Sequence, residues 1–299
     1  MPPLRFFAFL FLALSALTAT AKPLVVSTNT ILNDLVSAVG GDLVDGRCLL
    51  PPGADPHSYE PNPQDIRLLT QADLVVVNGL GLETWLQKLV ENAGLRRPAL
   101  VASTGVVPLH VGKSVTPDFD ERELGEIDPH AWQDPHNVRL YVENIRDALA
   151  GIDPAHADVF AKNTKAYCTR LDELDVFARE QISSLPSDQR KLVTSHDALH
   201  YLARTYGLTI VPVSGLSPDQ EPSAKSLAAL INFIRDQHVR AVFFESTTNP
   251  KIVSLVAQEA GVDVVGSLYT DSLGPPGSPG ATFAGMFRSN IEMIVKALK

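Results

Sequence analysis

One long stretch without helix breakers constrains the fold of this chain more than any other feature. After Asp153-Pro154 no glycine or proline occurs before Pro186, and apolar residues recur at helical spacing to about Leu185. A helix of that length would be roughly 45 Å long at 1.5 Å per residue. A crossover helix within one lobe needs less length than this, so we expect a stiff helix that is shared by two lobes.

Alternating strand and helix patterns flank this stretch on both sides. Continuous apolar runs, which are typical of parallel strands buried on both faces, predict strands at residues 24–27, 44–50, 73–78, 99–102, 192–194, 208–213, 239–245 and 262–265. The predicted fold is therefore α/β, with two βα lobes of parallel sheets joined by one long rigid helix. The expected division is an N-terminal lobe at 22–152, a linking helix at 153–187 and a C-terminal lobe at 188–299.

The first 21 residues are typical of a secretory signal peptide. Arg5 precedes an apolar run from Phe6 to Leu17 that is too short to span a bilayer, and Ala19-Thr20-Ala21 fits a cleavage site. An uncleaved anchor is the alternative. No cysteine follows the apolar run, so we expect an exported, periplasmic protein without a lipid anchor at that point.

Charge and cysteine content narrow the partners. The formal net charge is −9 and no basic tract occurs, which argues against nucleic acid as a partner. Export would permit a disulfide between Cys48 and Cys168, but two free thiols are the favoured expectation. The predicted strand and helix that carry these cysteines belong to different segments of the chain.

The tripeptide Asp-Pro-His occurs three times, at residues 55–57, 128–130 and 134–136. The first copy lies in a segment, 50–63, whose five prolines and one glycine exclude regular structure. Proline fixes φ, so each histidine is expected to stand on a stiff mount. A rigid loop that follows a strand and carries a histidine is a good place for a ligand.

Four side chains are candidate metal ligands: His57, His130, His196 and Asp271. Each follows a predicted strand or precedes a helix, where open α/β sheets bind their ligands. Imidazole nitrogen and carboxylate oxygen suit zinc or manganese. Each alone could instead be a solvated or structural residue. The remaining histidines have simpler interpretations: a possible substitute ligand that more plausibly packs inward (His200), a helix N-terminal residue (His136) and solvated side chains (His110, His156, His238).

The sequence resembles the cluster A-I metal-binding proteins of bacterial zinc and manganese ABC transporters over nearly all of the mature chain. The residues that carry the resemblance are Pro52-Gly53, Pro56 to Pro61, His130-Ala131-Trp132, Asp134-Pro135, Asn137, Thr194 to Ala198, Glu221-Pro222-Ser223, Phe244-Glu245 and Tyr269 to Leu273. The resemblance implies two βα lobes joined by one long helix, with one metal ion between the lobes. It also implies His57, His130, His196 and Asp271 as the ligand set.

The resemblance also bears on which metal is bound. The third ligand position in the family is histidine or glutamate, and here it is His196. The family's zinc proteins often carry a histidine-rich loop before the second ligand, whereas residues 103–129 contain only His110 before His130. Nitrogen ligands favour zinc, so zinc is expected first and manganese next.

The implied function is capture of the ion rather than catalysis. The expected partners are a membrane permease and its cytoplasmic ATPase, and the protein is expected to be a monomer. Glu245 and Ser195 are expected to support the ligands without binding the ion. The alternatives are a secreted zinc metallohydrolase, with Glu245 or Glu60 as its base, and a metal-binding surface adhesin.

Overall fold

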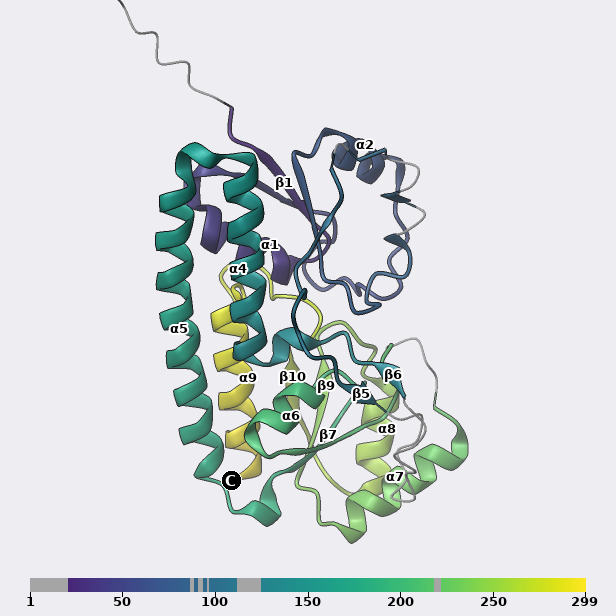
Figure 1. Ribbon diagram of the computed structural model, residues 1–299. Coiled ribbons are helices and arrows are strands. Elements are labelled where there is room, and N and C mark those ends of the chain that lie inside the picture. The colour runs from purple at the N-terminus through teal and green to yellow at the C-terminus, as the bar shows by residue number, and fades with distance from the viewer. Residues whose placement is uncertain (1–20, 87–88, 91–93, 96, 112–124, 218–221) are drawn as a thin grey trace, which may run out of the picture.

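A computed structural model describes residues 21–86, 89–90, 94–95, 97–111, 125–217 and 222–299 (Figure 1). Two four-stranded parallel sheets lie at the centre of the two lobes and confirm the predicted α/β fold. The first sheet has the order β2-β1-β3-β4, and its strands are β1 (Leu24–Ser27), β2 (Asp45–Cys48), β3 (Leu74–Val77) and β4 (Leu100–Val101). The second sheet has the order β10-β9-β7-β8, and its strands are β7 (Lys191–Thr194), β8 (Thr209–Pro212), β9 (Ala241–Glu245) and β10 (Val264–Leu268).

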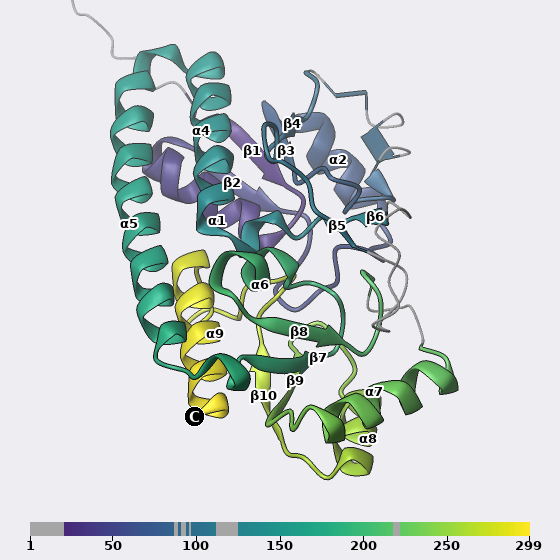
Figure 2. The same ribbon diagram turned by 60° about the horizontal axis from the view of Figure 1, so that its bottom comes forward.

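Helices cover both sheets, as Figures 1 and 2 show from two directions. The helices of the first half are α1 (Thr30–Gly40), α2 (Pro63–Gln71) and α4 (Pro135–Ile152). The later helices are α5 (Ala157–Ser183), α6 (His200–Tyr206), α7 (Ala224–Asp236), α8 (Lys251–Ala260) and α9 (Phe283–Leu298). Separate apolar clusters cover one face of each sheet, and β3 is buried at every residue, as its apolar composition predicts. The edge strands β2, β8 and β10 are only partly buried.

The long helix α5 ties the molecule together along one side (Figure 1). It packs against α1, α4 and α9, and one continuous core cluster extends from Val25 in β1 through Leu171 in α5 to Phe243 in β9. Helix α9 belongs to the end of the chain but contacts α1 as well as α5. The two sheets therefore share one apolar core on the α5 side.

Side-chain caps fix the helices that flank the loops of interest. Asn62 accepts a hydrogen bond from the amide of Gln64, and Asp65 accepts one from the amide of Asn62, which starts α2 directly after the 51–62 loop. Asp134 caps α4 by accepting a hydrogen bond from the amide of His136. These caps give the neighbouring loops fixed ends.

One expectation about the chain path was wrong. The last strand was expected to end at Val265, but β10 continues to Leu268, and Gly266 lies inside it. A Cβ at Gly266 would lie 2.7 Å from Sδ of Met293 in α9, so glycine allows the strand and this helix to approach closely. The short strands β5 (His110–Val111) and β6 (Glu126–Ile127) pair as an antiparallel ribbon. Residues 112–124 lie outside the described residues.

Candidate metal centre

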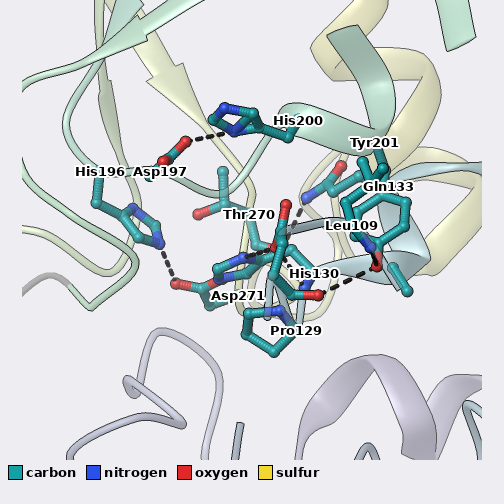
Figure 3. A network of polar contacts seen from close by, with 12 residues as sticks. Leu109, Pro129, His130, Gln133, His196, Asp197, His200, Tyr201, Thr270 and Asp271 are labelled. Carbon is teal, nitrogen blue, oxygen red and sulfur yellow. Dashed lines mark hydrogen bonds and ion pairs between the residues drawn. The ribbon is translucent and has the colours of Figure 1, made fainter. Parts of the chain in front are cut away.

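The four candidate ligands converge on one point between the lobes. One ligand atom from each of His57, His130, His196 and Asp271 lies within 4.8 Å of all the others. His130, His196 and Asp271 are fully buried at the side chain, whereas the side chain of His57 is 10% exposed. Figure 3 shows His130 and His196 on either side of Asp271.

The spacing of the ligand atoms fits a four-coordinate ion. Nε2 of His57 lies 3.1 Å from Nε2 of His130, which lies 3.3 Å from Oδ1 of Asp271. Nε2 of His196 lies 2.9 Å from Oδ2 of Asp271. Tetrahedral zinc with bonds near 2.1 Å holds its ligand atoms about 3.4 Å apart. The three distances above are close to that value, and the distance from Nε2 of His57 to Oδ2 of Asp271 is longer, at 4.0 Å.

Each lobe supplies two of these side chains, and each stands in the segment that follows a strand. His57 follows β2, and His130 follows β6 and immediately precedes a short 3-10 turn, Ala131–Gln133. His196 follows β7 and Asp271 follows β10. The carboxyl ends of both parallel sheets therefore face each other across the cluster, as the position rule for open α/β sheets predicts.

The repeated Asp-Pro-His tripeptide forms the same turn three times. In each copy the aspartate Oδ1 accepts a hydrogen bond of 2.9 Å from the amide of the histidine two residues later, in the pairs Asp55–His57, Asp128–His130 and Asp134–His136. This is the local bond by which aspartate mimics a backbone turn. The repeat therefore fixes the backbone of each histidine in the same turn. The histidines of the first two copies, His57 and His130, belong to the cluster, and that of the third, His136, does not.

His130 and His196 differ from His57 because a carboxylate contacts Nδ1 of each of their rings. Nδ1 of His130 lies 2.7 Å from Oδ1 of Asp128, and Nδ1 of His196 pairs with Glu245. Burial opposes the charged form of His130, but Asp128 and Asp271 outweigh it and raise its pKa to about 9. In the same way Glu245 and Asp271 overcome burial and raise the pKa of His196 well above its usual value.

The His57 ring has no such carboxylate behind it among the contacts of the described residues. Burial is the main cause that lowers its pKa to about 3. Burial also opposes the charged form of Asp271, but the neighbouring His196 and His130 hold its pKa well below the usual range. These shifts favour the charged forms of His130, His196 and Asp271 and the neutral form of His57.

Glu245 and Ser195, expected to support the ligands, occupy different places. Glu245 accepts a 2.9 Å hydrogen bond from the amide of His196 and another of 2.9 Å from the hydroxyl of Thr270, in addition to its ring pairing. The hydroxyl of Ser195 accepts a 3.0 Å hydrogen bond from that of Thr248 and makes no described contact with a histidine. Glu60, offered as a base for a hydrolase, is exposed.

Several supporting groups were missed from the sequence. Asp128 backs His130, and the repeat itself was the available signal, because Asp lies two residues before His in every copy. Trp132 and Gln133 donate to the carbonyl of Thr270 at 2.8 and 3.2 Å, which fixes the residue before Asp271. Nothing local in the sequence indicates contacts between residues so far apart in the chain.

The other histidines lie outside the cluster. Nδ1 of His136, His156 and His200 faces Asp134, Asp153 and Asp197 at 2.9, 2.6 and 2.5 Å. His200 is the first residue of α6 and lies near the site, but Figure 3 shows its ring turned toward Asp197. It is therefore not one of the four side chains that converge.

Solved structures share this architecture. A structure described as the periplasmic zinc binding protein TroA from Treponema pallidum matches with a TM-score of 0.84 and 32% identity, over 93% of this chain and 99% of that one. A manganese-bound periplasmic metal binding protein from Candidatus Liberibacter asiaticus matches with a TM-score of 0.81 and 30% identity, over 93% and 100%. The fold is that of the two-lobed metal-binding proteins.

The sequence comparison is more specific. Residues 25–297 match the family model described as "Zinc-uptake complex component A periplasmic", and the chain belongs to that family. Manganese-binding lipoprotein MntA of Halalkalibacterium halodurans is 35% identical over 92% of this chain and 88% of its own length. Iron-binding protein YfeA of Yersinia pestis is 36% identical over 93% and 87%.

Two features bear on location and covalent state. MntA and other relatives are named lipoproteins, which does not agree with the expectation that a lipid anchor is absent. Within the described residues, no helix is long and apolar enough to cross a bilayer. Cys48 and Cys168 are both free, as expected.

Proposed function

We propose that this protein captures one divalent transition metal ion in the cell envelope and delivers it to the membrane permease of an ABC transporter. The observation that carries the proposal is the convergence of three imidazoles and one carboxylate within 4.8 Å at a buried point between the lobes. Buried charged groups are costly unless paired or bound to a metal, and this cluster gives an ion a complete set of donors. His57, His130, His196 and Asp271 are the proposed ligands.

Family membership supports the transport role. The named relatives bind manganese, iron or zinc, and several are called substrate-binding lipoproteins of metal or manganese ABC transporters. The partner of this chain would be a permease with its cytoplasmic ATPase, and the protein would act as a monomer outside the cytoplasm. We propose zinc as the first choice and manganese as the second, because imidazole nitrogen favours zinc and the order of intrinsic affinities does so too.

Binding explains the geometry better than hydrolysis. A catalytic zinc keeps one open position for water, whereas four protein donors fill a tetrahedral shell. Glu245, the buried candidate for a general base, is already engaged with the amide and ring of His196. No residue role in a reaction is therefore proposed.

Elemental analysis of protein purified from its native envelope, without added metal, tests the proposal and identifies the ion. One ion per chain is expected. Titration calorimetry should then show that alanine at His57, His130, His196 or Asp271 costs more than the tenfold to hundredfold expected of an outer group. The exposed His110→Ala is the matched control. Affinity that is unchanged in all four variants would exclude this ligand set.

A further inference from the structure

Two of the four proposed ligands depend on loops for their position. His57 stands in the proline-rich loop after β2, and Asp271 begins the loop between β10 and α9. His130 and His196 are each held from behind by a carboxylate, Asp128 and Glu245. His57 lacks that support and is the most exposed of the four, so its place depends on whatever holds its loop.

One hydroxyl joins these two loops. Oγ of Ser272, the residue after Asp271, accepts a 2.8 Å hydrogen bond from the amide of Gly53, near the start of the His57 loop. The same oxygen lies 3.2 Å from Oγ1 of Thr30 and 3.1 Å from the carbonyl of Leu273, to which it donates. Oγ1 of Thr30 in turn accepts a 2.8 Å hydrogen bond from the amide of Leu273. We call this group, Thr30, Gly53 and Ser272 with the Leu273 backbone, the hydroxyl latch.

The latch crosses between the lobes at a buried point next to the ligands. Ser272 is 2% exposed, whereas Gly53 is exposed, has a φ of 83° and has open space where a Cβ would lie. If the latch opened, water could replace Ser272 as the partner of the Gly53 amide. Opening the His57 loop therefore leaves no buried amide unsatisfied, which keeps the energetic penalty small.

We propose that the hydroxyl of Ser272 sets the rate of metal release by latching the loop of His57 to the loop of Asp271. The inference rests on the proposed metal-binding function and adds to it a positioning residue and an order of release, in which His57 leaves first. Ser272 does not bind the ion. It acts by keeping His57 within reach of the ion while Asp271 remains bound.

Release kinetics of Ser272→Ala test the proposal. Zinc-loaded protein is mixed with an excess of chelator, and the intrinsic fluorescence of Trp85 and Trp132 reports release, since Trp85 donates to the carbonyl of Pro56 and the Trp132 ring lies 5.4 Å from that of His130. The dissociation rate should rise about tenfold, the factor that corresponds to one hydrogen bond of ordinary strength, while the association rate stays within about twofold.

The same loop offers a matched control. Ser278→Ala removes a hydroxyl that has no hydrogen-bond partner in the described structure, and it should release zinc at the wild-type rate. Thr30→Val should accelerate release as Ser272→Ala does, whereas Thr30→Ser, which keeps the hydroxyl, should not. The double variant Thr30→Val with Ser272→Ala should release no faster than Ser272→Ala alone, because both changes open one latch.

Two results would overturn the latch. One is release from Ser272→Ala and Thr30→Val at the rate of Ser278→Ala. The other is that these two variants also bind the ion more slowly and unfold at a lower temperature than the wild-type protein, which would mean a general structural defect. If wild-type protein bound no divalent transition metal ion, the proposed function itself would fail, so the two failures are distinguishable.

Discussion

Glu245 connects three strands of the second sheet at the proposed metal centre. It stands at the end of β9, bonds the amide and ring of His196 after β7, and accepts a hydrogen bond from the hydroxyl of Thr270 after β10. Glu245→Gln removes the charge that favours the ring proton on Nδ1 and hence a ligating Nε2. We expect metal affinity to fall about tenfold to hundredfold without being abolished. Calorimetry measures this, and the exposed Glu173→Gln should bind as wild type does; an ion seen directly on Glu245 would refute its supporting role.

His196→Glu tests which donors choose the metal. Replacing an imidazole by a carboxylate gives two nitrogen and two carboxylate donors, and the added charge and harder oxygens suit manganese better. Because zinc remains intrinsically stronger, the expected result is a narrower zinc-to-manganese affinity ratio rather than a reversal. Competition titrations of the two ions measure the ratio. His200→Gln on the neighbouring helix should leave it unchanged, and an equal ratio in His196→Glu would exclude His196 as a ligand.

Protons compete with the ion at two of the three imidazoles. Metal binds neutral imidazole, and the pKa of His130 is raised to about 9 and that of His196 well above its usual value, whereas that of His57 is lowered to about 3. At neutral pH two rings must each lose a proton and His57 none. Affinity should therefore rise with pH up to about 9, with a release of about two protons per ion at neutral pH.

Calorimetry in buffers of different ionisation enthalpy counts those protons. Asp128→Asn removes a charge that raises the pKa of His130, so the count should fall to about one at neutral pH. Binding without proton release in the wild-type protein would mean that the imidazoles are already neutral when the site is empty.

At the scale of elements, the first turn of helix α9, which belongs to the second lobe, contacts helix α1 of the first lobe. The amide of Phe283 donates to Asp34 of α1 at 2.8 Å, and Thr282 caps the same turn through the amide of Gly285. Asp34→Ala removes a partner from the first turn of α9. We expect the free energy of unfolding to fall by about 1–2 kcal/mol in urea denaturation. Glu173→Ala, at an exposed position, should change the free energy of unfolding by less than about 0.5 kcal/mol. If the two variants lowered it equally, the bond from Phe283 to Asp34 would not stabilise the protein.

The sequence predicted elements where a pattern is local and failed where a contact is distant. The buried run Leu74–Val77 is recognisable from its continuous hydrophobicity. Gly266 was interpreted as the end of a strand because glycine weakens a strand interior. Its close contact with Met293 of α9 is not visible in the local pattern. The proposed ligands could be named because each follows a strand; Ser272 and Thr30 could not, since their pairing spans more than two hundred residues.

At the scale of the whole molecule, the two lobes share an apolar core, whereas the predicted division joins them only through a linking helix at 153–187. One apolar cluster includes Leu35 of α1, Leu174 of α5, Phe287 of α9 and Phe243 of β9. Separating the lobes along this side would expose that core, at about 25 cal/mol for each Å² of apolar surface. The division into two lobes and a linking helix stays a proposal about folding units, and α9 is the element that crosses it.

This shared core limits how the protein can release an ion. Helix α5 contains no glycine or proline at which to bend, and it packs against α1, α4 and α9 along its length. We expect metal removal to change the radius of gyration by less than about 1 Å, because the backbone outside the ligand loops keeps its contacts. Solution X-ray scattering of the metal-free and metal-bound protein measures the change, and the wild-type protein before and after chelator treatment and reloading provides the control. A large reversible expansion would show that the lobes separate as rigid bodies, and release would then not depend on the loops of His57 and Asp271.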